Sequence, residues 1–451
     1  MKYDVVIIGS GLGGLECASI LARKGMRVLV LEQGTQAGGC MQSYRRGSVE
    51  YDTGFHCVGG IGEGESLYEV FRELNLLNLP WHQLDEHFDR IHIGNQTYCF
   101  AQGFDNFAMT LAKDFPEERD GLKELARLLK KSSDRIFSHD VFEKQSQTSA
   151  LQYLQSIIKN PLLIDILCTP ASVKGEMCRE SLPLFTFLHE NSECIESAWR
   201  LQGSGNMIVH SLMDDIIRMN GEVVTKARVA ELVVEGRQMT KAVCDDGRTF
   251  EAETFVSDVH PASTLAMIRS NLGIYRRRIS ALKNTNGMFT LSLQLRPRSL
   301  RYFNWNQYIV DGDRTMMINC RVSENGTEDA SQIDLLMPMP DVVFGDKTEY
   351  EVFRNRLADK CITIAERFIP RLSEMVEKRY ISTPQTYNRF TLTPGGSAFG
   401  IRKDYRNPMM TYLSPRTPIN NLFLTGQSLM LHGVHGVTLT AFDTCRNIIN
   451  T

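Results

Sequence analysis

The chain opens on a short apolar run, and the pattern that follows it predicts a βαβ unit. Residues 3–8 are almost continuously apolar, a glycine-rich stretch comes next, and a helical pattern runs from about Gly14 to Lys24 before a second apolar run at residues 28–31. Short apolar runs bounded by turn residues are typical of strands buried in a parallel sheet. The glycines that interrupt the opening run also argue against a signal peptide.

Helical patterning dominates between about residues 81 and 199, with long polar and apolar alternation at 122–136 and 149–167. Strand-like runs return at 221–234 and 254–257, separated by a polar turn. Helical periodicity followed by renewed strand patterns indicates that a mostly helical lobe is inserted into a sheet-containing domain.

A second excursion, residues 266–380, mixes strand patterns with a helix at 349–369. Its predicted strands are 288–295, 308–310 and 334–339. The whole pattern predicts a discontinuous nucleotide-binding domain and an interleaved substrate-binding lobe. The domain comprises residues 1–80, 200–265 and 381–451, and the lobe comprises residues 81–199 and 266–380.

Composition narrows the class of protein. A chain of 451 residues with 42% hydrophobic content exceeds what one compact domain usually holds, and a net charge of -3 gives no reason to expect a nucleic-acid partner. Eleven cysteines without a C-x-x-C pair favour reduced thiols in a cytoplasmic protein and argue against a metal site. Apolar runs of 18 residues are missing from the sequence, so we expect no membrane-spanning helix.

The loop after the first predicted strand has the spacing of a dinucleotide-binding motif. Gly9, Gly11 and Gly14 satisfy G-x-G-x-x-G, with Leu12 and Gly13 between them. Glycines at these positions permit a tight turn and let backbone N–H groups approach a pyrophosphate at the start of a helix. The motif alone is weak, since any tight turn before a helix can contain it.

A carboxylate strengthens the interpretation. Glu32 stands at the end of the second strand, at the position where an acid would accept hydrogen bonds from a ribose diol and repel the 2′-phosphate of NADP. The next residue, Gln33, is expected to contact the cofactor as well. The doublet Gly38-Gly39 and Cys40 follow shortly afterwards, and a plain NAD domain gives no reason for such a doublet.

Here the sequence resembles the flavin amine oxidase superfamily, and within it the FAD-dependent phytoene desaturases, carotenoid isomerases and retinol saturases. The resemblance rests on the glycine doublet and on the segment Asp-Thr-Gly-Phe-His at residues 52–56, and its Gly-Gly-Cys form is most like the retinol saturase branch. It implies a Rossmann-like FAD-binding domain of the GR2 type with an interleaved α+β substrate-binding domain. It also implies FAD contacts at Gly38, Gly39, Cys40, Thr53, Gly54, Phe55 and His56. We interpret Cys40 as a small residue beside the cofactor rather than a redox group.

The end of the chain resembles the second half of the same flavin site. An apolar run at 421–425 leads into Gly426, Gln427 and Ser428, and a glycine-rich stretch containing Gly436 and Val437 follows. In the family such a strand carries an acid to the ribityl chain, and the next helix directs its N-terminus at the flavin ring. Ser428 stands where the saturase-like form has an acid, which leaves that contact open. The resemblance also places Val229 beside the adenine.

The resemblance implies hydride transfer at flavin N5 on the carbon–carbon bonds of an apolar polyene, isoprenoid or retinoid-like substrate, as a saturase, desaturase or isomerase. Candidate proton donors are His432, His435, Tyr387 and His56, each in a motif expected near the flavin, although each also has a purely structural interpretation. The lobes offer six residues for an apolar tunnel, most of which we expect to be ordinary core: Leu182, Leu184, Phe185, Phe187, Leu188 and Met267.

Two alternatives stay open. A flavin amine oxidase would share the motifs, although we identify no aromatic cage for an amine in the sequence. A non-enzymatic prenyl-lipid binding module of the same fold would not need the flavin motifs to be intact. A basic run at residues 275–279 leaves peripheral membrane contact possible. Reaction direction, electron partner and oligomeric state do not follow from the sequence.

Overall fold

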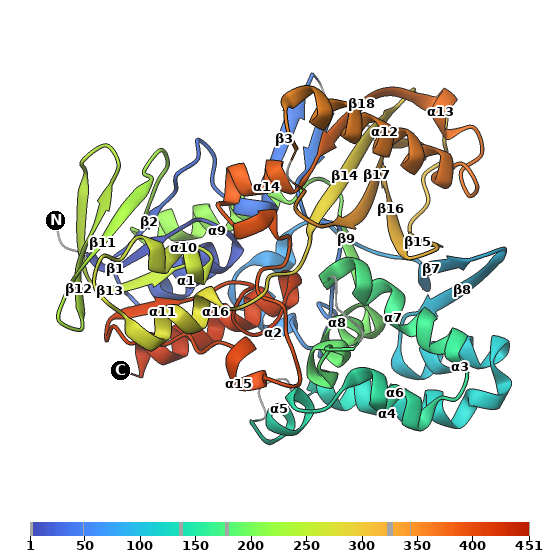
Figure 1. Cartoon of the computed structure of the whole chain (residues 1–451), viewed down its shortest axis with the longest axis horizontal. Helices are drawn as coiled ribbons and strands as arrows, with labels where there is room; N and C mark the ends of the chain where they lie inside the picture. Colours follow the sequence, from blue (N-terminus) through green and yellow to red (C-terminus); the bar gives the residue numbers. More distant parts are fainter. Residues whose placement is uncertain are drawn as a thin grey trace.

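Two large sheets organise the molecule. The computed structural model describes residues 3–47, 49–134, 139–175, 180–322, 328–342 and 344–450. In Figure 1 the sheet nearer both chain ends lies on the left, the second lies at the upper right, and the helices α3 to α8 lie at the lower right. Each sheet has seven strands.

The first sheet collects strands from the beginning, middle and end of the chain. Its order is β10-β2-β1-β13-β12-β11, with β19 paired to β13. The strands are β1 (Tyr3–Ile8), β2 (Val28–Leu31), β10 (Glu222–Val224), β11 (Val229–Glu235), β12 (Gln238–Cys244), β13 (Thr249–Ser257) and β19 (Leu422–Leu424). Ile8 of β1 pairs in parallel with Ser257, which in turn pairs with Leu424. Their carboxyl ends therefore meet at one edge, where ligands of open α/β sheets bind.

Alternation along β1 explains why both faces of this sheet are covered. Val5 and Ile7 belong to one buried cluster, and Val6 and Ile8 belong to another. Successive side chains of a strand point to opposite faces of the sheet, so the apolar residues 5–8 of β1 must be covered on both faces. Helices α1 (Leu12–Arg23), α9 (Asn206–Arg218) and α16 (Gly433–Ile449) contribute to the first cluster, and α10 (Pro261–Ala266) and α11 (Gly273–Ser280) contribute to the second.

The second sheet has the order β18-β14-β17-β16-β15-β7-β8. Its strands are β7 (His87–Ile93), β8 (Gln96–Ala101), β14 (Gly287–Leu295), β15 (Asn306–Asp311), β16 (Arg314–Val322), β17 (Ala330–Met339) and β18 (Val376–Ser382). Helices α12 (Lys347–Ala365) and α13 (Leu372–Met375) cover one face. Met288 and Leu336, on the other face, join a core that includes the helices α3 (Phe104–Asp114), α4 (Arg119–Asp134) and α8 (Leu184–Glu196).

The remaining elements are short and connect these layers. The strands are β3 (Ser43–Arg46), β4 (Val49–Asp52), β5 (Val58–Gly59), β6 (Trp81–Gln83) and β9 (Ala198–Leu201). The helices are α2 (Tyr68–Glu73), α5 (His139–Ser146), α6 (Ala150–Ile157), α7 (Pro161–Gly175), α14 (Pro384–Thr391) and α15 (Pro408–Thr411). Single 3₁₀ turns occupy Gly39–Met41, Leu76–Asn78, Pro116–Glu118 and Pro394–Gly396.

Several expected elements differ from the structure. The helix expected at 149–167 is two helices, α6 and α7, because Pro161 disfavours helical geometry at the residue before it. The stretch expected at 122–136 begins earlier, at Arg119, and its last two residues lie outside the described ranges. The lobe expected to be mostly helical also supplies β6, β7, β8 and β9. The proposed domain boundaries stay a prediction. Among the described helices, none is long and apolar enough to cross a membrane.

Candidate cofactor and substrate site

A cavity of about 710 Å³ opens where the carboxyl ends of the first sheet's parallel strands meet. Its volume is in the usual range for small-molecule and cofactor sites. The lining comes from the ends of β1, β2, β13 and β19, from α14 and from Met288 and Leu336 of the second sheet. The cavity therefore runs from the glycine loop to the opposite sheet.

Glycines let three distant segments meet at one end of this cavity. A Cβ atom on Gly13 would lie 3.1 Å from both N and Cα of Gly426, and one on Gly39 would lie 3.0 Å from Cα of Gly11. These distances are shorter than ordinary van der Waals contact. The N-terminal loop, the glycine doublet and the C-terminal motif form one cradle that any side chain would fill.

Glu32 organises the loop beside this cradle. Its Oε2 accepts hydrogen bonds from the backbone N–H of Ser10, at 3.1 Å, and from the Ser10 hydroxyl, and its Oε1 accepts from the Gly34 N–H at 2.6 Å. The carboxylate lines the cavity at the end of β2. This is the position from which an acid can bind a ribose diol.

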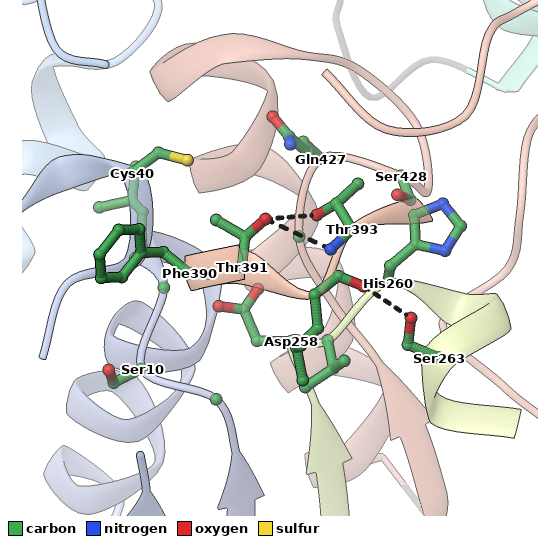
Figure 2. A pocket seen from close by; sticks show the side chains of 18 of the residues that line it. Ser10, Cys40, Asp258, His260, Ser263, Phe390, Thr391, Thr393, Gln427 and Ser428 are labelled. Carbon is green, nitrogen blue, oxygen red and sulfur yellow. Dashed lines mark hydrogen bonds between the residues drawn. The ribbon is translucent and has the colours of Figure 1, made fainter. Parts of the chain in front are cut away.

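Asp258 and His260 also line the cavity, and sequence reasoning missed both. Asp258 follows β13 and accepts backbone hydrogen bonds from Gly14 and Gly11 of the glycine loop. Figure 2 shows its carboxylate directed into the pocket. His260 is the N-cap of α10: its Nδ1 accepts from the Ala262 N–H at 3.2 Å, and burial lowers its pKa to about 4. His260 is therefore a neutral structural cap.

The last turn of α14 and the residue after it lie at the rim of the cavity. The amide of Gln33 donates to the Phe390 carbonyl at 2.9 Å, and the Ser263 hydroxyl donates to the Leu392 carbonyl at 3.0 Å. Phe390 is 61% exposed and Leu392 is 36% exposed, although both line the cavity. Hydrogen bonds from Gln33 and Ser263 thus hold the apolar side chains of Phe390 and Leu392 at the rim of the site.

The C-terminal motif is held from behind by a buried lysine. Lys403 Nζ donates to the carbonyls of Thr411, Ser428 and Leu429 at 3.0, 2.9 and 2.8 Å. Burial lowers the pKa of Lys403 to about 7. Gln427 donates its side-chain amide to the Ala398 carbonyl at 3.0 Å. These bonds fix the loop that carries Gln427 and Ser428 into the cavity.

Most residues expected to contact a cofactor line the cavity. They are Gly9, Gly11, Leu12, Gly13, Glu32, Gln33, Gly39, Cys40, Thr53, Gly54, His56, Val229, Gly426, Gln427, Ser428 and Val437. Burial, and then the nearby Asp258, raise the pKa of Cys40 to about 11, so this group is a thiol at neutral pH.

Four expected residues lie behind the wall of the cavity. A Cβ on Gly14 would meet the Gly9 carbonyl at 2.3 Å, and one on Gly38 would meet Val209 Cγ2 at 2.7 Å. Gly436 packs equally closely on Leu431, and Phe55 lies edge-on to Trp81. These positions support the cradle through packing.

The four proton-donor candidates separate into two pairs. Tyr387 and His56 line the cavity. The Tyr387 hydroxyl donates to the Thr53 carbonyl at 3.1 Å, and burial raises its pKa far above neutral. His56 Nδ1 accepts from the Asn319 amide at 3.0 Å, and burial lowers the pKa of His56 to about 4, so its ring is neutral.

His432 and His435 point elsewhere. His432 is buried at the N-cap of α16 near the Phe399 ring, and burial lowers its pKa to about 3. His435 Nε2 lies 3.2 Å from the Ser66 hydroxyl, which donates to Glu196. The structure therefore brings Tyr387 and His56 together at the cavity and leaves these two histidines outside its lining.

Met288, Leu336 and Phe399 pack in one hydrophobic cluster and form an apolar wall of the cavity, whereas Met267 lines the cavity within the cluster that contains Val229. Of the six residues considered for a tunnel, Met267 lines it, whereas the other five belong to buried core clusters. The expected basic run lies on α11, where Arg276 and Arg278 donate to backbone carbonyls.

The residues present fit a dinucleotide cofactor. The glycine cradle leaves room for a pyrophosphate where three backbone segments approach, and Glu32 stands at the ribose position. Val229 and Ala230 supply an apolar wall beyond Glu32.

Comparison with known proteins shows similarities that extend beyond the glycine loop. Residues 7–74 match the family described as an NAD(P)-binding Rossmann-like domain. Human all-trans-retinol 13,14-reductase is 25% identical, and the alignment covers 96% of this chain and 83% of that protein. Prolycopene isomerase 1, chloroplastic, from an Oncidium hybrid cultivar is 21% identical over 95% of this chain and 80% of that protein.

Among solved structures, cyclohexylamine oxidase from Brevibacterium oxydans superposes with a TM-score of 0.68 at 14% identity and covers 100% of both chains. At that identity the match shows that the fold is shared. The fold, the cradle and these similarities indicate an oxidoreductase with a Rossmann-like nucleotide-binding domain and a flavin-type cofactor. Within that class, the chain is similar over nearly its whole length to a retinol reductase and to a carotenoid isomerase. The predicted fold class is thereby confirmed, and these relatives support the predicted resemblance to the desaturase, isomerase and saturase family.

Proposed function

We propose that the protein is an FAD-dependent oxidoreductase that acts on carbon–carbon bonds of an apolar polyene, isoprenoid or retinoid-like substrate. The observation that carries the proposal is one cavity whose walls change along its length. The glycine cradle and Glu32 form one end, and Met288, Leu336 and Phe399 form an apolar end. The names of the aligned reductase and isomerase support a polyene.

Different residues of the chain would bind different parts of the cofactor. Backbone N–H groups of the glycine loop would hold the pyrophosphate, Glu32 the ribose diol, Val229 the adenine, and Ser428 the ribityl chain. FAD, when bound, supplies hydride transfer at N5. The apolar wall then positions the substrate and excludes water, which favours transfer over side reactions.

Where the reaction requires a proton, the polar groups of Tyr387 and His56, which line the cavity, would donate it. Tyr387 keeps its hydroxyl proton at neutral pH, because burial raises its pKa. His56 is neutral, and Asn319 occupies its Nδ1, so its remaining ring proton is on Nε2. Both groups therefore hold a proton at a defined atom near the apolar wall.

The first experiment is an absorbance spectrum followed by anaerobic reduction and challenge with retinoid and carotenoid polyenes. We expect flavin bands at about 370 and 450 nm, and reoxidation that removes the long-wave absorbance of a polyene. Reduction of the flavin by amines, with no response to polyenes, would identify an amine oxidase instead. A protein that does not take up FAD would contradict the proposal and favour a lipid-binding module.

A pair of variants tests the role assigned to Tyr387. Tyr387→Phe should keep the flavin spectrum and slow polyene turnover about 10²-fold or more, the range for loss of a general acid. Tyr405→Phe, outside the cavity lining, should react as the unmodified protein does. Equal turnover in both variants would remove Tyr387 from the mechanism.

A further inference from the structure

The carboxyl group of Asp258 lies inside the glycine cradle. A Cβ on Gly11 would lie 2.3 Å from Asp258 Oδ2, and Cβ atoms on Gly426 and Gly13 would lie 2.5 and 2.9 Å from Oδ1. One carboxyl group therefore touches three glycines from two distant segments, where only glycine leaves room for it. Asp258 is half-buried, because one side of it faces the cavity.

This carboxyl group uses the backbone donors that suit a phosphate. It accepts hydrogen bonds from the N–H groups of Gly14 and Gly11 at the N-terminus of α1. Such N–H groups, together with the helix dipole, are the usual anchor for a pyrophosphate. An ionised Asp258 therefore places a negative charge where an anionic ligand needs to bind.

The neighbouring carboxylate of Glu32, directly after β2, opposes that charge. Glu16 of α1 and Cys40 are also close enough to interact with Asp258, but burial raises the pKa of Glu16 to about 8 and that of Cys40 to about 11, so neither supplies a positive charge that would stabilise the Asp258 anion. The pKa of Asp258 is raised to about 7, mainly by removal from bulk water and also by the charge of Glu32, against the opposing effect of the Gly14 and Gly11 amides. The buried His260, two residues along, is neutral and supplies no compensating charge.

We infer that Asp258 is protonated in the FAD complex, so that FAD binding takes up one proton from solvent and the Asp258 O–H donates to a pyrophosphate oxygen. The inference rests on the proposed function, because it requires FAD as the ligand. The proton comes from water or buffer, and only hydrogen bonds are exchanged. An ionised carboxylate would compete with the phosphates for the loop amides and repel them, whereas the acid is a donor.

A pH dependence of FAD affinity follows. With a free-protein pKa of about 7 for Asp258, and a complex that keeps its proton throughout, the dissociation constant should rise about 90-fold between pH 6 and pH 9. At pH 8 about 0.9 proton should be taken up per FAD bound, and at pH 6 about 0.1.

The holoenzyme provides the measurement. It is diluted at pH 6, 7, 8 and 9, and free FAD is quantified by its fluorescence at equilibrium. Calorimetric titration of the cofactor-depleted protein with FAD at pH 8, in two buffers of different ionisation enthalpy, counts the protons directly. A rise in the dissociation constant together with uptake near one proton supports the inference.

Two variants separate Asp258 from the other acids. Asp258→Asn keeps the shape and stays neutral, so its FAD affinity should be nearly flat from pH 6 to pH 9 and exceed that of the unmodified protein at pH 9. Asp245→Asn removes another carboxylate that lines the cavity, away from the cradle, and should keep the pH dependence. An equal slope in the Asp258→Asn variant would assign the proton to another group and overturn the inference.

The outcomes also distinguish this inference from the function on which it rests. Absence of FAD binding at pH 6 would contradict the proposed function. FAD binding with no proton uptake at pH 8 would overturn only the role of Asp258. Because the two-buffer titration uses the unmodified chain, a variant that fails to fold does not affect this test.

Discussion

Gly13→Ala tests whether the cradle depends on contact between backbone atoms of the two ends of the chain. The added methyl group would lie 3.1 Å from N and Cα of Gly426 and 2.9 Å from Asp258 Oδ1. Overpacking of this kind costs about 1–3 kcal/mol, whereas alanine is favoured over glycine inside a helix such as α1 by about 1 kcal/mol. The net loss in unfolding free energy should therefore stay below about 2 kcal/mol.

Cofactor affinity should change more than stability does. Gly426 begins the turn that carries Gln427 and Ser428 into the cavity, so displacing it moves their contacts with the cofactor. We expect FAD to bind at least about tenfold more weakly, which corresponds to about 1.4 kcal/mol. The measurements are urea unfolding of the apoprotein and FAD titration at pH 6.5.

Gly25→Ala is the matched control at the other end of α1. Gly25 has a φ of +84°, and its added Cβ would meet nothing within 4 Å. Backbone strain should cost about 1–2 kcal/mol of stability and leave FAD affinity unchanged. If Gly13→Ala bound FAD within threefold of the unmodified protein, or if both variants lost affinity equally, the contact between Gly13 and Gly426 would have no specific role in cofactor binding.

Three further predictions concern buried polar groups. Asp215→Ala should lower the unfolding free energy in urea by about 3–5 kcal/mol, because it removes the partner of Arg23, whose Nε lies 2.7 Å from the carboxylate. The control Arg218→Ala removes an exposed partner of the same carboxylate and should cost less than about 1 kcal/mol. Burial raises the pKa of Glu16 to about 8, so the folded protein holds a proton that the unfolded chain releases above the ordinary pKa of 4.5. The contribution of Glu16 to the unfolding free energy is therefore highest below about pH 4.5 and falls as the pH rises to about 8, and Glu16→Gln should gain on the unmodified protein by about 1.4 kcal/mol per pH unit between pH 5 and pH 8 in denaturant titrations. Lys403→Met should cost about 2–4 kcal/mol by leaving three buried carbonyls without a donor, and it should reduce flavin content with the melting temperature.

Most residues expected to contact a cofactor line the cavity, because their signals in the sequence are local. The glycine loop and Glu32 lie within one βαβ unit, where spacing alone determines which side chains share an edge. Asp258 could have been found by one more step. A parallel strand ending at Ser257 beside β1 places the next residue at the glycine loop, but that pairing joins segments some 250 residues apart and leaves no local pattern.

The substrate end was harder to predict for a physical reason. Strand β7 carries Asp89 and His92 in buried positions, so the strict alternation of polar and apolar residues is missing. The candidate tunnel residues are apolar because they pack in the core, and periodicity does not distinguish a core residue from a cavity wall. Only the tertiary arrangement brings Met288 and Leu336 to the cavity.

The first and last helices pack together, and this has a consequence for biosynthesis. The hydroxyl of Thr438 on α16 donates to Glu16 of α1 at 2.7 Å, and the Cys445 thiol donates to the Cys17 carbonyl at 3.8 Å. Strand β19 and α16 both come from the final thirty residues. While residues 422–449 are still inside the ribosome, β13 lacks one of its two parallel neighbours, β19, and α1 exposes the apolar surface that α16 later covers. The nascent chain therefore emerges with an open cofactor cradle, and we expect holding chaperones to engage it until residues 422–449 have emerged.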